Sequence, residues 1–131
     1  MKTDDLSKVK DVLQDLNRRF SDEEQKGQEA VPFFERYLSD KLIFRLVSGQ
    51  TIGKHGPNGF LENLKKGTPF VSRRSEDIAI ELVGDRALVT LIVVGTRGDG
   101  GLDRFRNIRL FTRSEDCWIL EFWYNFKLQD M

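Results

Sequence analysis

Cysteine and histidine are nearly missing from this chain of 131 residues, which contains one of each. A single cysteine excludes a disulfide within the chain and any zinc site built from several cysteines. A single histidine likewise excludes a metal site with two histidine ligands. We therefore expect no metal and no cofactor, and we expect any acid–base chemistry to depend mainly on carboxylates.

The sequence also lacks an excess of charge of one sign. Its 21 basic and 21 acidic side chains cancel, which argues against a nucleic-acid coat or a polybasic membrane anchor. Residues 86–113 have six arginines against two aspartates and include the interleaved segment RFRNIR, a pattern seen in single-strand binders. The neutral whole nevertheless predicts no nucleic-acid partner.

Long hydrophobic runs are absent as well. The longest, Leu91 to Val94, is too short to cross a bilayer, so no membrane association is expected. The first residues, MKTDDLSKVK, are polar and do not have the pattern of a secretory signal. Together with the lone Cys117, these features predict a cytoplasmic protein.

Three helices are predicted from the spacing of apolar residues. Residues 3–24 have one apolar face, which favours an amphipathic helix lying on the core of its own domain, a partner helix being the alternative; the face is formed by Leu6, Val9, Leu13, Leu16 and Phe20. Residues 30–38 predict a second helix, with Pro32 near its first turn. Residues 60–66 predict a third, which Gly67 ends.

The rest of the chain reads as strands. Residues 41–48 form one predicted strand, and residues 70–83, 86–96, 102–113 and 117–128 form an antiparallel meander with turns at 84–85 and 114–116. Helices followed by an antiparallel sheet predict an α+β fold. The length predicts a single domain over residues 1–131.

Three segments carry a resemblance to a known family: FFERYLSDKLIFRLVSGQTIGKHG, the hairpin VGDRALVTL, and the ending RNIRLFTRSEDCWILEFWYNFKL. Over nearly the whole chain they resemble the nuclear transport factor 2-like superfamily, specifically its SnoaL-like small domains of uncharacterised function. The resemblance implies a curved, mixed or antiparallel sheet that forms a cone around N-terminal helices, the cystatin-like architecture, with an internal pocket and frequent homodimers. Because this superfamily includes isomerases, dehydratases, cyclases, hydrolases and non-catalytic binding modules, the fold does not specify the function.

Strand parity predicts which side chains line the pocket. A three-residue turn at 114–116 would pair Arg113 with Cys117 and place Arg109 opposite Glu121. One face of the last two strands then mixes aromatic and polar groups, as small-molecule cavities do; it holds Phe105, Asn107, Arg109, Phe111, Ile119, Glu121, Trp123 and Asn125. The other face is more uniformly apolar toward the C-terminus and is predicted to be a packed or dimer surface; it includes Ile108, Leu110, Trp118, Leu120, Phe122, Tyr124 and Phe126.

Arg109 and Glu121 are the predicted centre of the site. An arginine–carboxylate pair can hold an anionic or hydroxylated ligand, or keep Glu121 ionised as a general base, with Tyr37 helping to orient the ligand. The alternative is a cross-strand ion pair of structural value only. Further candidate ligand contacts are Trp123, Asn107, Phe105, Phe34 and Arg45. Core packing is the alternative for the aromatic residues, and pairing with a carboxylate such as Asp77 is the alternative for Arg45.

Other motifs are set aside. The segment GQTIGKH lacks the spacing of a phosphate-binding loop, and His55 stands where that loop needs serine or threonine. His55 lies in a glycine-rich loop and is expected to be solvent-exposed rather than functional. Cys117 has no identifiable histidine partner, which argues against nucleophilic catalysis.

The sequence thus predicts a domain that binds a small, partly apolar molecule in an internal pocket and forms a homodimer through the outer face of its sheet. Two other functions stay open: a cofactor-free isomerase, dehydratase or cyclase with a carboxylate base, and a non-catalytic dimerisation module. A sealed core would favour the module, whereas an open pocket that reaches Glu121 would favour the enzyme.

Overall fold

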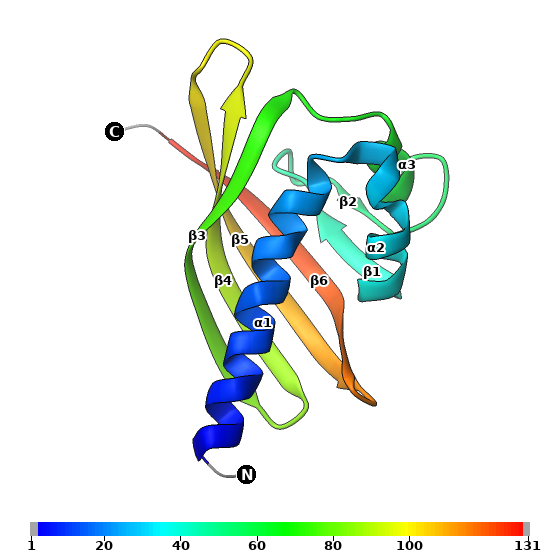
Figure 1. Ribbon diagram of the computed structural model, residues 1–131. Coiled ribbons are helices and arrows are strands. Elements are labelled where there is room, and N and C mark those ends of the chain that lie inside the picture. Colours follow the sequence, from blue (N-terminus) through cyan, green and yellow to red (C-terminus); the bar gives the residue numbers. More distant parts are fainter. Residues whose placement is uncertain (1–2, 130–131) are drawn as a thin grey trace.

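The computed structural model describes residues 3–129, with side chains from residue 6 onward, and shows helices packed on one face of a curved sheet (Figure 1). The elements in chain order are α1 (Thr3–Glu24), the 3-10 helix η1 (Gly27–Ala30), α2 (Val31–Tyr37), β1 (Leu38–Arg45), β2 (Thr51–Ile52), α3 (Phe60–Lys65), β3 (Phe70–Val83), β4 (Arg86–Arg97), β5 (Leu102–Ser114) and β6 (Cys117–Leu128). The predicted α+β class is confirmed. None of the described helices is long and apolar enough to cross a membrane.

The six strands form one mixed sheet in the order β2-β1-β6-β5-β4-β3. Strands β3 to β6 are the predicted antiparallel meander. Strand β1 instead runs parallel to β6, and the short β2 closes the edge next to it. β2 was not predicted, because two residues are too few for an alternating pattern to be visible.

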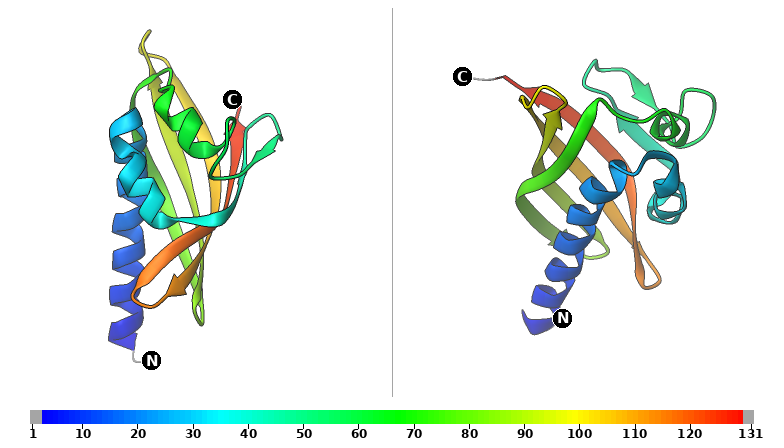
Figure 2. Two further views of the ribbon diagram at one scale, coloured as in Figure 1. Left: turned by 90° about the vertical axis from the view of Figure 1, so that its right-hand side faces the viewer. Right: turned by 45° about the horizontal axis from the view of Figure 1, so that its top comes forward.

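Helix α1 lies along one face of the sheet, and α2, α3 and β1 gather at the end of α1 that is farther from the N-terminus (Figure 2). Leu13, Leu16 and Phe20 of α1 are buried in the core, so the predicted amphipathic helix does lie on its own domain. The hydroxyl groups of Ser21 on α1 and Ser75 on β3 are 2.7 Å apart and tie the helix to the sheet.

The register of β5 and β6 differs from the predicted one in two ways. The turn has two residues, Glu115 and Asp116, because Ser114 pairs with Cys117; Glu115 has a φ of +57°, a left-handed conformation that closes this tight turn. A bulge then shifts the pairing between Leu110 and Phe111.

The bulge changes which residues of β6 face the helices. Leu120 pairs with Phe111 and Trp123 pairs with Arg109, so Glu121 is the inserted residue without a partner on β5. The predicted pairing of Arg109 with Glu121 is therefore wrong. Trp118 and Leu120, expected on the outer face, are buried in the core.

Candidate functional site

A buried polar cluster lies between α1 and the middle of the sheet. Arg109 on β5 is fully buried, and its guanidinium donates 2.9 Å hydrogen bonds to Oδ1 of Asn17 on α1 and to Oδ1 of Asn107 on β5. The indole Nε1 of Trp123 on β6 donates a 2.6 Å hydrogen bond to the same Oδ1 of Asn107. Three elements thus converge on two asparagine side chains.

Arg109 remains a cation although no carboxylate within the described residues forms a hydrogen bond with it. Its guanidinium lies 4.5 Å from the ring centroid of Trp123 and 5.1 Å from that of Phe20, and both ring faces attract the charge. Burial lowers the pKa of Arg109 to about 10; Glu24 opposes this change, and Arg73 adds to it. At neutral pH the guanidinium is therefore still protonated.

The neighbours of Asn107 determine the orientation of its side-chain amide. The indole N–H and the guanidinium can only donate, so the oxygen of Asn107 must face both of them. The amide nitrogen Nδ2 then faces the other way, and within residues 3–129 it has no hydrogen-bond partner. Because Asn107 is 1% exposed, its two N–H groups are buried donors without an acceptor.

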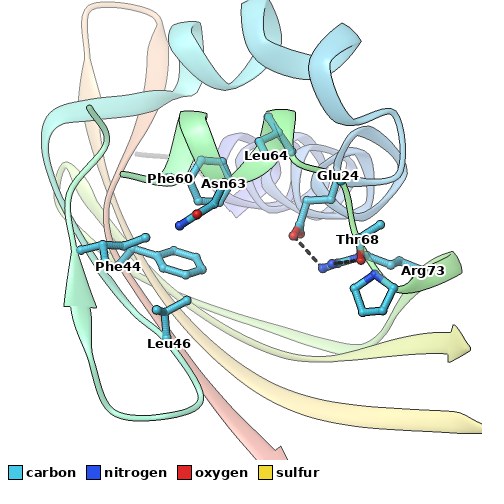
Figure 3. Close-up of a pocket in the computed structure, with 11 residues that line it drawn as sticks. Glu24, Phe44, Leu46, Phe60, Asn63, Leu64, Thr68 and Arg73 are labelled. Atoms are coloured by element: carbon cyan, nitrogen blue, oxygen red, sulfur yellow. Dashed lines mark hydrogen bonds and ion pairs between the residues drawn. The ribbon is translucent and has the colours of Figure 1, made fainter. Parts of the chain in front are cut away.

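A second polar group stands nearer the surface. Arg73 on β3 forms a 2.7 Å ion pair with Glu24 at the end of α1 and donates a 2.7 Å hydrogen bond to the hydroxyl of Thr68 (Figure 3). The side chains of Arg73 and Glu24 are only 19% and 11% exposed, so solvent screens this pair weakly. The Nε of Arg73 is buried and has no partner in the described part of the chain.

Two adjoining hollows open beside this ion pair and share Glu24, Phe44, Leu46 and Arg73 as walls. The first has a volume of about 180 Å³ and extends under α3, where Phe60, Asn63 and Leu64 line it (Figure 3). The second has a volume of about 200 Å³ and extends over the sheet toward Phe105, Asn107 and Asn125. Apolar walls with a few polar groups are the usual composition of a small-molecule site.

Gly95 on β4 leaves room for one wall of the second hollow. A Cβ atom on Gly95 would lie 2.6 Å from the ring of Phe70, which is closer than any real contact. Phe70 lines the second hollow and meets the ring of Phe105 edge-on, with 5.8 Å between the centroids. The glycine therefore lets an aromatic ring cover the sheet at this point.

The structure places the candidate residues of the sequence in different settings. Asn107 and Phe105 line the second hollow. Trp123 and Phe34 are fully or almost fully buried and pack in the aromatic core with Phe20 instead of lining either hollow. Trp123 still contacts the wall of the second hollow indirectly, through its hydrogen bond to Asn107.

Two other candidates, Arg45 and Tyr37, lie away from the hollows. Arg45 is exposed, since Phe44 and Leu46 on either side of it face inward. Its alternative partner Asp77 lies on β3, which β6, β5 and β4 separate from β1, so this pairing is excluded. Tyr37 lines a separate hollow next to Trp118 and the β5–β6 turn.

Glu121 does not take part in the polar cluster. Glu121 is half-buried at the bulge and lines neither of the two hollows. The acid–base role expected for Glu121 required contact with Arg109 and an open pocket, and the observed register supplies neither.

The loop after β2 is held in place by the hydrogen bonds of Lys54. Lys54 is 4% exposed, and its ammonium group donates 2.9 Å hydrogen bonds to the carbonyl oxygens of Glu35 and Leu38 at the end of α2. Asp40 contacts both Lys54 and His55 at 3.2 Å, and these hydrogen bonds, with His55 first, lower the pKa of the Asp40 carboxyl. His55 is exposed as expected.

No group of three or more histidine, cysteine, aspartate or glutamate side chains in the described residues is placed to hold a metal ion.

Asn17, Glu24 and Arg73 were not among the sequence candidates. A signal for two of them exists, because Leu13, Asn17, Phe20 and Glu24 follow one another at intervals of four, three and four and therefore share a helix face. A polar residue within an apolar helix face indicates a buried polar contact. Arg73 gives no comparable signal, because it lies in a run of six polar residues of β3, Ser72 to Asp77.

Comparison with known proteins identifies the fold. No protein-family model matches the chain, and no curated protein matches it at a significant level. Among solved structures, an NTF2-like protein from Cytophaga hutchinsonii is 18% identical with a TM-score of 0.77, and the match covers 98% of this chain and 100% of that one. A candidate scytalone dehydratase from Novosphingobium aromaticivorans is 11% identical with a TM-score of 0.77, over 98% and 89% of the two chains.

A third structure broadens the range of functions found on this fold. It is a candidate calcium/calmodulin-dependent kinase II association domain from Exiguobacterium sibiricum, 22% identical with a TM-score of 0.66 over 91% of this chain and 92% of that one. Identities this low establish architecture and leave activity open. The chain has the nuclear transport factor 2-like fold, as its sequence motifs predicted.

Proposed function

We propose that the protein binds a small, partly apolar molecule in the two adjoining hollows, with a hydrogen-bond acceptor of that molecule on the amide of Asn107. One observation carries the proposal. Arg109 and Trp123 hold the oxygen of Asn107, so its Nδ2 is a buried and unpartnered donor on a residue that lines the second hollow. Leaving such a donor unpaired costs about 1 to 3 kcal/mol, which an acceptor on a ligand would recover.

The walls suit the apolar part of such a molecule. Phe44 and Leu46 line both hollows, and further aromatic rings line each of them, Phe60 in the first and Phe70 and Phe105 in the second. Apolar surface removed from water contributes about 25 cal/mol per Å², so a single buried ring supplies a useful share of the binding free energy.

A hollow with a buried donor also distinguishes this proposal from a purely structural module. A non-catalytic dimerisation module needs no internal hollow, whereas the second hollow here has an unpartnered donor, Nδ2 of Asn107, on a residue of its wall. The dimerisation role expected from the outer sheet face is compatible with binding and is treated as a separate prediction below.

Cofactor-free proton transfer is the second candidate function, and Glu24 replaces Glu121 in it. Glu24 is the carboxylate that lines both hollows in the described structure, and Arg73 holds it in place at 2.7 Å. A positioned carboxylate can remove a proton next to a carbonyl group. In this case Glu24→Gln abolishes turnover of a bound carbonyl compound while the compound still binds.

Three pairs of probes test the binding proposal: benzoate and benzamide, phenylacetate and phenylacetamide, hexanoate and hexanamide. At least one probe should raise the melting temperature of the protein and bind in calorimetry. Leu46→Trp fills both hollows and should weaken that binding at least tenfold, whereas the control Val83→Trp changes an exposed residue at the β3–β4 turn and should not. Binding that Leu46→Trp leaves unchanged, or no binding by any of the six probes, contradicts the proposal.

A further inference from the structure

We infer that the ligand is an anion, specifically a small apolar molecule that carries one carboxylate. This inference rests on the proposed function and assigns the chemical class of its ligand. Three observations support it. The charged side chains near the hollows have a net positive charge, and the buried polar atoms without a partner are all hydrogen-bond donors. In addition, the side-chain amide of Asn107 is polarised by its neighbours.

The charges beside the hollows leave an excess of one positive charge. Glu24 and Arg73 line both hollows and neutralise each other in their ion pair. Arg109 lies behind Asn107, the next residue of the hydrogen-bond chain, and has no anionic hydrogen-bond partner within residues 3–129. A buried cation without a counterion is costly, and an anion nearby reduces that cost.

The unpaired polar atoms are all donors. In the described structure three buried side-chain polar atoms lack a partner: Nε of Arg73, Nδ2 of Asn107 and Nε of Arg109. Each is a nitrogen that carries hydrogen, and no buried side-chain oxygen of these residues is left without a partner. An amine would leave these donors without acceptors, whereas a carboxylate is purely an acceptor with about four lone-pair sites.

The hydrogen bonds to the side-chain oxygen of Asn107 make its amide N–H groups better donors to an anion. Its oxygen accepts a hydrogen bond from the charged guanidinium of Arg109 and a second one from the indole of Trp123. Two donors on one oxygen, one of them cationic, draw electron density from the amide and strengthen its N–H groups as donors. Hydrogen bonds to an ionised acceptor are about twice as strong as neutral ones, so this polarisation favours a carboxylate over an uncharged carbonyl.

The wall that the two hollows share already holds one carboxylate, that of Glu24. Arg73 binds Glu24 with one guanidinium nitrogen and Thr68 with another, in a setting that is mostly withdrawn from solvent. Glu24 therefore shows that a carboxylate is stabilised at this position, and it also repels a second one. Removing its charge should strengthen the binding of an anion, while removing the charge of Arg73 should weaken it.

A water molecule could occupy the polar end of the second hollow instead of a ligand. It can accept a hydrogen bond from Asn107 as a ligand can, and a site that holds water would not select a charged ligand over a neutral one. The test must therefore compare ligands that differ in charge and have nearly the same shape.

The acid and amide pairs named above provide this comparison, because an amide replaces one carboxylate oxygen with an NH₂ group. In calorimetry, the acid of any pair that binds should bind at least tenfold more tightly than its amide. Glu24→Gln should tighten binding of the acid several-fold, and Arg73→Gln should weaken it at least tenfold, with the amide nearly insensitive to both. Glu23→Gln and Arg74→Gln are matched controls, because these neighbours line neither hollow and should change nothing.

The outcomes separate this inference from the proposed function. Equal binding of acid and amide, or tighter binding of the amide, overturns the inferred charge and leaves the binding proposal standing. No binding by either member of any pair overturns both. The comparison of acid with amide on the unaltered protein decides the matter even where Arg73→Gln does not fold.

Discussion

The guanidinium of Arg109 donates a 2.9 Å hydrogen bond to the side-chain oxygen of Asn17, 92 residues earlier in the chain. Both residues are fully buried, so this bond joins the middle of β5 to the first helix through the core. Asn17 is in turn held by its own helix, because its Nδ2 donates a 2.7 Å hydrogen bond to the carbonyl oxygen of Leu13.

Replacing Asn17 should destabilise the protein because it leaves a buried charged donor without its acceptor. Asn17→Ala is expected to lower the free energy of unfolding by about 2 to 3 kcal/mol. Urea denaturation followed by circular dichroism measures this change. Arg18→Ala is the control, because Arg18 is exposed on the same helix turn and should change stability by less than about 0.5 kcal/mol. Equal effects of the two substitutions would show that the Arg109–Asn17 bond does not contribute.

The lowered pKa of Arg109 predicts a pH dependence with a definite sign. Burial lowers this pKa from its usual value to about 10 in the folded protein. Above pH 10 the folded state therefore releases the proton while the unfolded chain keeps it, and the free energy of unfolding gains a contribution that rises with pH. The penalty for the buried charge is complete below the folded pKa and is relieved progressively as the pH rises above about 10.

Comparison with Arg109→Met isolates this contribution from other groups that titrate in alkali. The difference in unfolding free energy between the original protein and the variant should be constant from about pH 6 to pH 9. It should then shift in favour of the original protein as the pH passes about 10. A difference that already changes near neutral pH would mean that another group causes it.

The outer face of the sheet predicts a homodimer. Leu88, Leu110 and Phe122 lie side by side on β4, β5 and β6, on the face opposite Arg109 and Trp123, and Leu88 is 42% exposed. A second copy would bury this apolar row. Sedimentation velocity at micromolar concentration should give twice the chain mass, and Leu110→Glu should give a monomer.

Val83→Glu serves as the control for this experiment, because Val83 is exposed at the β3–β4 turn. It should leave the sedimentation unchanged. A monomer for the original protein at micromolar concentration would rule out the dimer.

Lys54 should stabilise the junction between α2 and β1. Its buried ammonium binds the carbonyl oxygen of Glu35, in the last turn of α2, and that of Leu38, where β1 begins, together with Asp40. Lys54→Met is therefore expected to lower the free energy of unfolding by about 2 to 4 kcal/mol. Lys41→Met, at an exposed position of β1, should cost less than about 0.5 kcal/mol. Thermal and urea denaturation of the two variants test this, and a Lys54→Met protein as stable as the control would contradict the role.

Local patterns in the sequence predicted most of the elements. The apolar face of α1, the hairpin turn at Gly84 and Asp85, and the four long strands all depend on residues close together in the chain, and each was found within a few residues of its predicted bounds. β1 starts three residues earlier than predicted, at Leu38, because α2 leads directly into it. No local pattern indicates where such a junction falls.

The site was predicted less well, because it depends on a single bulge and on long side chains. Counting along β5 correctly grouped Asn107 with Arg109, since alternation within one strand is local. The partner of Arg109 on β6 required the number of residues in the turn and the position of the bulge, and both differed from the expectation.

By itself, the sequence determined that this chain is an α+β protein with a meander of four strands, because the periods of helices and strands are properties of neighbouring residues. Only the tertiary structure decided that Arg109 meets Asn17 and Asn107 instead of Glu121, and that the ion pair of Glu24 and Arg73 lines both hollows. The physical reason is that one inserted residue at Glu121 changes the face of every residue before it on β6 relative to those after it, and burial then selects the partners that satisfy the guanidinium.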